Sequence, residues 1–340
     1  MQNDGNTVLL PQPIGEEAQK YLEEKGINIL LAGEPKPESV APLIKRAKAI
    51  VLRTGIAITR DLIDQADELL TISRTGGGVD NVDMDYATKK GIIVTSSLGI
   101  NTSSVVEHCI ALITALFKQL FLMDREVRKK NYAVRYKNIP RDLAGKTLGI
   151  AGFGRIGSEL ARTCHTAFKM NILAFDKYLP EEAKRELDSW VRFTGLKEVF
   201  GSSDVVSIHL PLTEETKELI DFSYFSLMKP GAFLINTSRG GVINEKDLIR
   251  ALSESLIAGA GLDVLEKEPP DEDNPLLKMK NVILTPHSAA LTAECVNRMA
   301  VEAARRVIDV LDGFIPPNIA NPEVLKHKRW ESLKERNTHS

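Results

Sequence analysis

The stretch that decides the fold reads Thr147-Leu148-Gly149-Ile150-Ala151-Gly152-Phe153-Gly154-Arg155-Ile156-Gly157-Ser158-Glu159-Leu160-Ala161. Its first five residues predict a buried strand, and the residues after the last glycine predict a helix. Between them the glycines have the spacing GxGxxG. Gly152 permits a tight turn, Gly154 lets the backbone approach a pyrophosphate, and Gly157 lets the helix pack on the strand. The stretch therefore predicts a dinucleotide-binding turn, with the helix N-terminus facing the phosphates.

A carboxylate follows the next predicted strand, Asn171–Phe175. Asp176 lies 19 residues after Gly157, a separation at which an acidic residue accepts hydrogen bonds from the ribose hydroxyls. A carboxylate there also repels a 2′-phosphate, which favours NAD over NADP, although the cationic Lys177 lies beside it. The alternative interpretation is a glycine-rich turn followed by a solvated aspartate, with no ligand.

The composition is typical of a soluble globular protein with two domains. The chain has 340 residues, of which 43% are hydrophobic and 26% charged, and about 150 residues per domain gives two domains. A net charge of −2 excludes binding to nucleic acid or anionic membranes by bulk charge. We find no signal peptide or membrane span. Cys109, Cys164 and Cys295 lack the spacing of redox or metal sites, so we expect a cytoplasmic protein without a metal.

Short apolar runs separated by amphipathic stretches predict two parallel sheets. Most runs lack strict alternation, as expected for strands covered on both faces. Strands that alternate with helices form βαβ units, so the fold class that we expect is α/β, with two doubly wound domains. The first series is Thr7–Leu10, Ile27–Leu31, Ala49–Leu52, Leu70–Ser73 and Ile92–Val94; the second is Thr147–Ala151, Asn171–Phe175, Val191–Phe193, Val205–His209, Phe233–Asn236, Ala258–Asp263 and Val282–Thr285.

A long apolar helix separates the two series. Ser104 and Glu107 have the spacing of a capping box at its start, and apolar residues continue on several faces as far as Val127. A helix that is apolar on most faces is buried, so we expect a homodimer whose interface includes this helix after residue 103. The alternative is an inter-domain helix in a monomer. A second helix is expected over residues 292–311, and residues 323–340 are expected to form a polar tail that is mostly solvated from His327 to Ser340.

Three residues with complementary chemistry lie near the ends of the last predicted strands. Arg239 can hold a substrate carboxylate and polarise the neighbouring carbonyl, and His287 can supply or remove a proton. Glu268, paired with the other ring nitrogen, would raise the pKa of His287, and Asp263 could orient a nicotinamide amide. Singly, each residue has a plainer explanation as a loop charge or a structural histidine. Together they predict hydride transfer to a carbonyl.

Four stretches in this order resemble the D-isomer-specific 2-hydroxyacid dehydrogenases. They are the glycine-rich turn with Asp176, NTSRGGVIN (Asn236–Asn244), GAGLDVLEKEP (Gly259–Pro269) and NVILTPHSAA (Asn281–Ala290). The resemblance covers about residues 7–322. It implies two Rossmann-like domains joined by crossing helices: a discontinuous substrate-binding domain of residues 1–101 and 291–322, and an NAD-binding domain of residues 102–290.

The resemblance also implies site residues. The catalytic arginine, glutamate and histidine of the family match Arg239, Glu268 and His287; formate dehydrogenases carry glutamine in place of Glu268, which disfavours formate. The cofactor-binding residues that we expect are Gly152, Gly154, Arg155, Ile156, Gly157, Asp176, Leu210, Pro211, Thr237, Ser238, Arg239 and Asp263.

The substrate loop of the family resembles residues Ser73–Asp83. Its backbone N–H groups at Gly76 and Gly77 would bind the substrate carboxylate, and Arg53 and Arg74 match arginines near the phosphate in 3-phosphoglycerate dehydrogenases. Gly77 replaces a threonine common in that subgroup. The expected substrate-binding residues are Arg53, Arg74, Gly76, Gly77, Arg239 and His287.

The expected function is that of an NAD-dependent enzyme which acts on a small (R)-2-hydroxy acid, with 3-phosphoglycerate as the first candidate. The alternative within the family is a hydroxypyruvate or glyoxylate reductase. An alternative of another class is an NAD-sensing binding protein, since the family resembles certain transcriptional corepressors. We expect no nucleic-acid or membrane partner.

Overall fold

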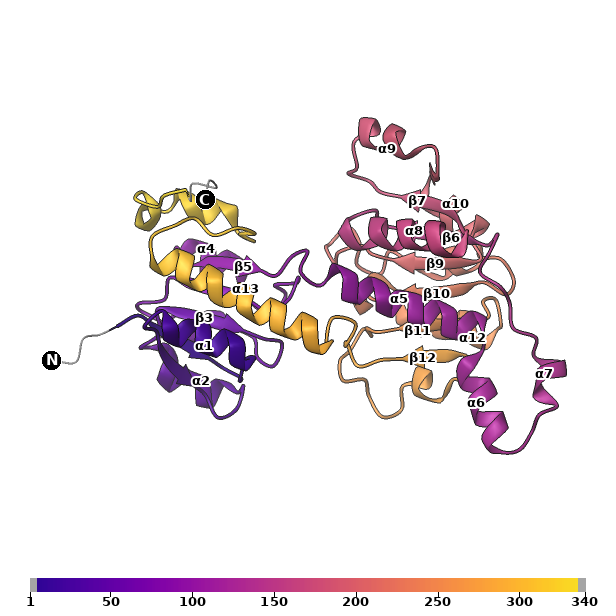
Figure 1. Ribbon diagram of the computed structural model, residues 1–340, viewed down its shortest axis with the longest axis horizontal. Coiled ribbons are helices and arrows are strands. Elements are labelled where there is room, and N and C mark those ends of the chain that lie inside the picture. The colour runs from indigo at the N-terminus through magenta and orange to yellow at the C-terminus, as the bar shows by residue number, and fades with distance from the viewer. Residues whose placement is uncertain (1–4, 336–340) are drawn as a thin grey trace. The chain divides into compact units, whose positions relative to one another are not determined.

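The computed structural model of the protein describes residues 5–335. The described chain forms two compact units: unit 1 comprises residues 5–101 and 291–335, and unit 2 comprises residues 102–290. The chain enters unit 2 at helix α5 (Thr102–Phe117) and re-enters unit 1 just before helix α13 (Ala293–Leu311) (Figure 1).

Unit 1 contains a five-stranded parallel sheet in the order β2-β1-β3-β4-β5. Apolar side chains of its central strands are buried on both faces, as a parallel sheet requires. Helices α1 and α13 cover one face, and α2, α3 and α4 cover the other. The elements are β1 (Thr7–Leu10), α1 (Glu16–Glu24), β2 (Asn28–Leu31), α2 (Pro37–Ile44), β3 (Ala49–Leu52), α3 (Arg60–Ile63), β4 (Thr71–Arg74), α4 (Met84–Lys89) and β5 (Ile93–Ser96).

Unit 2 contains a seven-stranded parallel sheet in the order β12-β11-β10-β9-β6-β7-β8. Helices α5 and α8 pack on one face, and α10, α11 and α12 pack on the other. The elements are α6 (Leu120–Arg128), α7 (Val134–Lys137), β6 (Thr147–Ala151), α8 (Arg155–Phe168), β7 (Asn171–Phe175), α9 (Glu181–Leu187), β8 (Val191–Phe193), α10 (Leu196–Ser202), β9 (Val205–Ile208), α11 (Phe222–Phe225), β10 (Phe233–Asn236), η1 (Gly240–Val242), α12 (Glu245–Ser253), β11 (Gly259–Leu262), η2 (Pro275–Lys278) and β12 (Val282–Leu284).

The expected fold class of two parallel-sheet α/β domains is confirmed. Each of the expected strands is present, with ends that differ by no more than two residues. Continuous runs of apolar residues were a sufficient signal here, because strands buried on both faces need little polar alternation.

The single long helix of the sequence analysis is wrong. Gln119 has a φ of 51° and separates α5 from α6, whose axes differ by 57°. Helix α5 begins at Thr102, so Ser104 lies buried inside its first turn and does not form the expected cap. Among the described residues no single helix is long and apolar enough to cross a membrane; α5 and α6 meet that criterion only as a bent pair.

Most residues of the expected C-terminal tail are exposed within the described range 323–335, but the tail is anchored to the fold; residues 336–340 lie outside the described residues. This segment, with η3 (Pro322–Lys326) and η4 (Lys328–Trp330), packs on unit 1. The Trp330 side chain is 8% exposed, and its Nε1 donates to the Gly91 carbonyl at 2.9 Å. Just before it, Asn321 Oδ1 accepts from Val94 N of the edge strand β5 at 2.9 Å. The segment therefore covers the edge strand β5, whose backbone groups need hydrogen-bond partners. The polar composition of the segment gave no sign of this role.

Candidate active site

The expected site residues of unit 2 follow the carboxyl ends of its strands. Strand β6 lies between β7 and β9; the chain adds β7 and β8 on one side and then returns to add β9 to β12 on the other. Ligands of doubly wound sheets bind at the carboxyl ends, where the order reverses in this way. The glycine-rich turn follows β6, and Leu210-Pro211 lie just beyond β9. Arg239, Asp263 and His287 follow β10, β11 and β12.

Two glycines of the turn are required by the packing and backbone conformation of the protein, without reference to a ligand. Gly152 has a φ of 100°, and a Cβ there would lie 2.7 Å from the His209 carbonyl oxygen. A Cβ at Gly157 would lie 2.1 Å from the carbonyl oxygen of Gly152. Because both positions lack a Cβ, the strand, the turn and helix α8 can lie this close together.

Gly154 differs from the other two glycines. A Cβ placed there would meet no described atom within 4 Å, and the residue is the N-cap of α8. The packing of the described residues therefore gives no reason for a glycine at this position. A pyrophosphate that approaches the backbone closely, at the N-terminus of a helix, does give one. The turn therefore fits the dinucleotide expected from the sequence.

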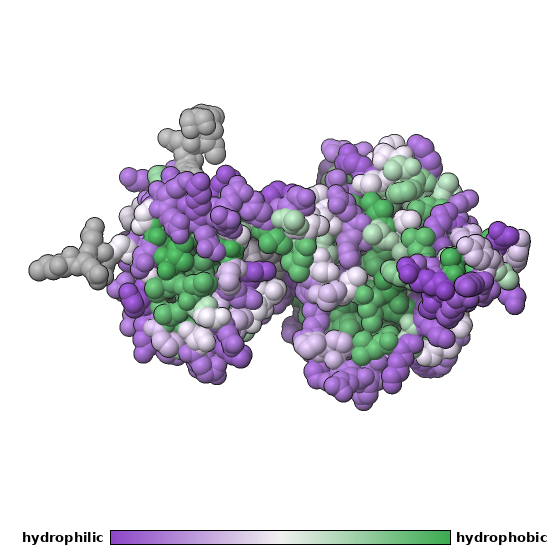
Figure 2. All heavy atoms as spheres, turned by 60° about the horizontal axis from the view of Figure 1, so that its bottom comes forward, coloured by the Kyte–Doolittle hydropathy of each residue, from purple (hydrophilic) through white to green (hydrophobic). Residues whose placement is uncertain are grey.

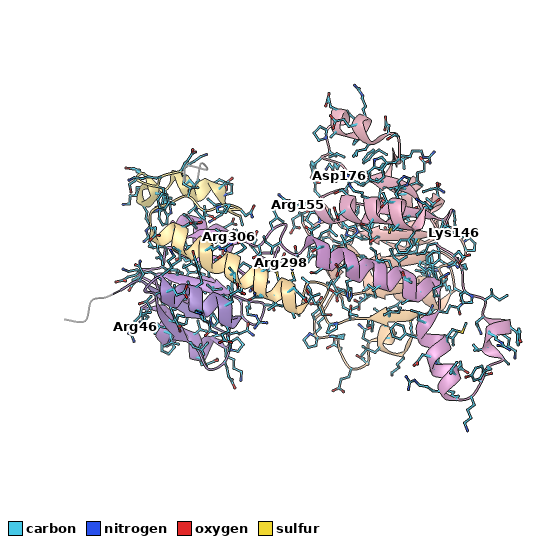
Figure 3. The ribbon with its side chains drawn as sticks, in the orientation of Figure 1. Arg46, Lys146, Arg155, Asp176, Arg298 and Arg306 are labelled. Carbon is cyan, nitrogen blue, oxygen red and sulfur yellow. The ribbon has the colours of Figure 1, made fainter. Side chains whose placement is uncertain are left out.

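Asp176 connects the end of β7 to the glycine-rich turn. Its Oδ2 accepts from Phe153 N at 2.8 Å, and its Oδ1 accepts from the backbone N–H groups of Tyr178 and Leu179 at 2.8 and 2.9 Å. Figure 3 shows Asp176 and Arg155, the first residue of α8, at the same end of unit 2. The neighbouring Lys177 is paired with Glu215 at 2.6 Å. The acidic residue thus lies beside the turn, and its cationic neighbour is partly neutralised.

The loop that carries Arg239 is shaped by a buried amide. Asn236 is fully buried; its Nδ2 donates to the Arg239 carbonyl at 2.9 Å, and its Oδ1 accepts from Ser238 N at 3.0 Å. A Cβ at Gly240 would lie 1.9 Å from the Leu265 carbonyl oxygen. Only glycine therefore lets the Arg239 loop pack against the segment that leads to Glu268. Sequence reasoning quoted Asn236 within a motif but assigned it no role.

His287 and Glu268 are in direct contact. His287 Nδ1 lies 2.7 Å from Glu268 Oε2, and the other carboxylate oxygen of Glu268 accepts from Leu265 N at 3.1 Å. The hydrogen bond to Glu268 raises the pKa of His287, against the opposing effects of burial and of Arg239. Burial raises the pKa of Glu268, but the hydrogen bond and charge of His287 outweigh it and the net pKa is lowered. The pair therefore favours imidazolium beside carboxylate.

The backbone of His287 is held by Asp263. His287 has a φ of 52°, and its N–H donates to the Asp263 carbonyl at 2.8 Å. The Asp263 carboxylate, on a residue only 1% exposed, accepts from Ser288 N at 2.8 Å and from Ala289 N at 2.9 Å. These bonds hold the uncommon left-handed conformation that directs the imidazole. The expected contact of Asp263 with a nicotinamide stays a prediction.

A second histidine, which the sequence analysis missed, completes this network. Thr285 Oγ1 donates to Asp263 Oδ1 at 2.6 Å, because a carboxylate oxygen accepts. The same hydroxyl lies 3.0 Å from His108 Nε2 and must then accept from it, which assigns the proton of His108 to Nε2. His108 is on α5, far from Thr285 in the sequence, and no local pattern indicates this contact. His209, whose pKa burial lowers to about 4, is a neutral imidazole behind the turn.

In unit 1 the expected substrate residues lie at the ends of β3 and β4. Arg74 is 8% exposed, and its Nε donates to Asn81 Oδ1 at 2.8 Å; Asn81 Nδ2 in turn donates to the Arg53 carbonyl at 3.0 Å. A Cβ at Gly76 would lie 2.7 Å from Arg74 Nη1. Asn81, for which the sequence indicated no role, thus contacts the side chain of Arg74 and the backbone of Arg53, whose own Nη1 donates to the Pro13 carbonyl at 2.9 Å.

Comparisons with known proteins agree on one family. Residues 110–289 match the sequence model described as D-isomer specific 2-hydroxyacid dehydrogenase, NAD binding domain. The chain is 37% identical over 326 residues to the D-3-phosphoglycerate dehydrogenase of Archaeoglobus fulgidus, covering 96% of this chain and 61% of that protein. It is 38% identical over 325 residues to the glyoxylate reductase of Korarchaeum cryptofilum, covering 94% and 97%.

A solved structure gives the same result. The D-lactate dehydrogenase of Aquifex aeolicus, in complex with NAD and lactic acid, has 31% sequence identity and a TM-score of 0.81 over 94% of this chain and 98% of that one. The chain spans about three fifths of the length of the archaeal phosphoglycerate dehydrogenases that it matches. From its sequence and its fold, the chain belongs to the D-isomer-specific 2-hydroxyacid dehydrogenase family.

Proposed function

We propose that the protein transfers hydride reversibly between NAD(H) and a small (R)-2-hydroxy acid or the corresponding 2-oxo acid. The observation that carries this proposal is the His287–Glu268 pair, 2.7 Å apart, at the sheet edge that also holds Arg239 and the glycine-rich turn. A paired imidazole supplies a proton, an arginine holds an anion, and the turn fits a dinucleotide.

The chemistry of each residue follows from its charge. The glycine-rich turn, the start of α8 and Asp176 would hold NAD(H), which would supply or accept the hydride when bound. Arg239 stabilises the negative charge that develops on the carbonyl oxygen of the 2-oxo acid as the hydride arrives. His287, protonated beside Glu268, gives its Nε2 proton to that oxygen, which becomes the hydroxyl. In the oxidation of the hydroxy acid, neutral His287 removes the same proton.

Asp176 is proposed to select NAD over NADP. Asp176→Ala removes the negative charge that opposes a 2′-phosphate, so we expect the ratio of kcat/KM for NADH to that for NADPH to fall by about tenfold. The measurement is a titration of both coenzymes at saturating 2-oxo acid.

Asp176→Asn is the matched control for backbone structure, since its Oδ1 can still accept from Tyr178 and Leu179. Because it also removes the charge, the ratio should fall in both variants. An unchanged ratio in both would remove Asp176 from the ribose site.

The first candidate substrate is 3-phosphoglycerate, whose oxidised form is phosphohydroxypyruvate. Arg53 directly follows β3, and Arg74 ends the adjacent strand β4. Asn81 contacts the side chain of Arg74 and the backbone of Arg53, and two cations at neighbouring strand ends suit a dianionic phosphate. NADH oxidation with phosphohydroxypyruvate, hydroxypyruvate and glyoxylate tests this assignment. A preference of at least about tenfold in kcat/KM, ~1.4 kcal/mol, for the phosphorylated acid supports it.

A hydroxypyruvate or glyoxylate reductase is the second candidate. It is favoured by the glyoxylate reductase that matches this chain over 97% of its own length. A preference for the unphosphorylated acids would establish it and leave both arginines as general anion attractants. Binding of NADH without turnover on any of the three acids would instead favour an NAD-sensing protein.

We also propose a homodimer formed by unit 2. Leu120, Phe121 and Ile139 are exposed by 50%, 61% and 73%, and they lie at or near an apolar groove of about 370 Å³ in which Leu116 and Phe233 take part. Figure 2 shows hydrophobic residues over a broad area of unit 2. Large exposed apolar patches mark interaction surfaces.

The test of the dimer is a charge placed on this surface. Phe121→Glu should convert a dimer to a monomer in sedimentation velocity, because a carboxylate cannot be buried unpaired. Tyr178→Glu is the control and should leave the dimer intact, because the Tyr178 side chain is exposed by 76% and does not line the apolar groove. A monomeric wild type would refute the proposal.

A reducing compartment, the cytoplasm, is part of the same proposal. Cys109, Cys164 and Cys295 are all buried and form no disulfide with one another. Burial raises the pKa of Cys109 and of Cys164 to about 12, so both are thiols at neutral pH. Fractionation of cells that produce the protein, followed by immunodetection, tests the location.

A further inference from the structure

Helix α13 carries a buried arginine in unit 1. Arg306 is 2% exposed and is the largest of the fully buried side chains among the described residues. Figure 3 labels Arg306 on this helix. Burial lowers the pKa of Arg306, whereas the carboxylates of Glu302 and Asp309 on the same helix favour its charged form. Burial of a guanidinium costs several kcal/mol unless hydrogen bonds compensate. The hydrogen-bond partners of Arg306 therefore indicate which part of the structure the buried guanidinium supports.

Those contacts lead to the loop expected to bind the substrate carboxylate. Arg306 Nη1 donates to the Ser96 carbonyl at 2.8 Å and lies 3.5 Å from Ser97 Oγ. Ser97 Oγ donates to the Arg74 carbonyl at 3.0 Å, and Ser97 N donates to the Gly76 carbonyl at 2.9 Å. An unbroken series of hydrogen bonds thus connects α13 with both ends of the segment from Arg74 to Gly76.

We propose that Arg306 is a positioning residue for substrate binding, which holds the backbone of the Arg74–Gly76 segment in place through Ser96 and Ser97. The inference rests on the proposed function and on the expectation from the sequence that the N–H groups of Gly76 and Gly77 bind the substrate carboxylate. A loop held in its binding conformation loses less conformational entropy when the ligand arrives.

The expected consequence is confined to substrate affinity. Arg306→Met keeps a long apolar side chain but removes the donors to Ser96 and Ser97. We expect KM for the preferred 2-oxo acid to rise about tenfold, with kcat within about twofold of wild type. The dissociation constant of NADH should not change, because the proposed coenzyme residues belong to unit 2 and Arg306 belongs to unit 1.

The neighbouring residue offers a matched control. Arg305 is on the same helix, its side chain is 55% exposed, and it pairs with Glu302 at 2.5 Å. Arg305→Met removes the same chemical group from the surface and should leave KM unchanged. Arg306→Lys should recover most of the affinity, since an ammonium can still donate to the Ser96 carbonyl, and a purely space-filling role would not predict that recovery.

A second variant covers the case in which Arg306→Met does not fold. Ser97→Ala removes the hydroxyl between Arg306 and the Arg74 carbonyl and should raise KM about threefold. In a folded double variant the two effects should not add, because both substitutions interrupt the same series of hydrogen bonds.

Calorimetric titration with 3-phosphoglycerate and with D-glycerate gives a readout without turnover. We expect the dissociation constant of the tighter ligand to rise about tenfold in Arg306→Met and not in Arg305→Met. Unchanged ligand affinity in both Arg306→Met and Ser97→Ala, or an equal loss of NADH affinity, would overturn the inference. Absence of turnover in the wild type would contradict the proposed function instead, and the titration would still decide the role of Arg306.

Discussion

Replacement of His287 by alanine is expected to lower kcat by about a thousandfold while the affinity for NADH stays within about twofold. General acid–base catalysis contributes between about a hundredfold and ten-thousandfold, and His287, with its raised pKa, is the proposed proton donor in reduction. The coenzyme is expected to bind through the glycine-rich turn and Asp176, neither of which bonds to the imidazole. Stopped-flow reduction of a 2-oxo acid, with fluorescence titration of NADH, measures both quantities.

The backbone of this residue requires a second variant. His287 has a φ of 52°, a conformation that asparagine adopts more readily than alanine. His287→Asn should therefore preserve the loop and still lose kcat to a similar extent. His165→Ala, near the C-terminal end of α8, is the control histidine and should leave kcat unchanged. Turnover close to wild type in His287→Asn would remove the proton-transfer role.

Replacement of Glu268 by glutamine should shift the pH dependence of reduction to lower pH. The hydrogen bond to Glu268 is the main cause that raises the pKa of His287, whereas burial and Arg239 lower it. Without the carboxylate charge the pKa of His287 falls. As the pH rises, the protonated form that reduction needs is therefore lost at a lower pH than in the wild type. Above the ordinary histidine pKa of about 6.5, kcat/KM for reduction should fall on the order of tenfold.

The opposite direction provides the check on sign. Oxidation of the hydroxy acid needs neutral His287, so in Glu268→Gln its activity should extend to lower pH than in the wild type. Glu266→Gln, an exposed acidic neighbour in the same segment, is the control and should leave both profiles unchanged. If the pH profiles of reduction and of oxidation in Glu268→Gln coincide with those of the wild type, Glu268 does not set the pKa of His287.

The sequence was sufficient to predict features that depend on local pattern. Apolar runs predicted the twelve strands, because a strand buried on both faces consists almost entirely of apolar residues. The spacing of Gly152, Gly154 and Gly157 predicted the turn between β6 and α8, since each glycine answers a steric need within a few residues. The order of strands and polar ends was enough to expect Arg239, Asp263 and His287 at one edge of a sheet.

Other features exist only once the chain has folded. The bond between His108 and Thr285, and the series from Arg306 to Arg74, join residues that no period or motif relates. The same holds for Trp330, whose polar surroundings in the sequence suggested a solvated tail and which instead donates to Gly91 beside the edge strand. A hydrogen bond between residues distant in the sequence depends on the positions of both partners in the folded chain. The residues that neighbour each partner in the sequence do not determine those positions. The residues that support a site are therefore seen only in the tertiary structure, whereas those expected to perform the chemistry are visible in the sequence.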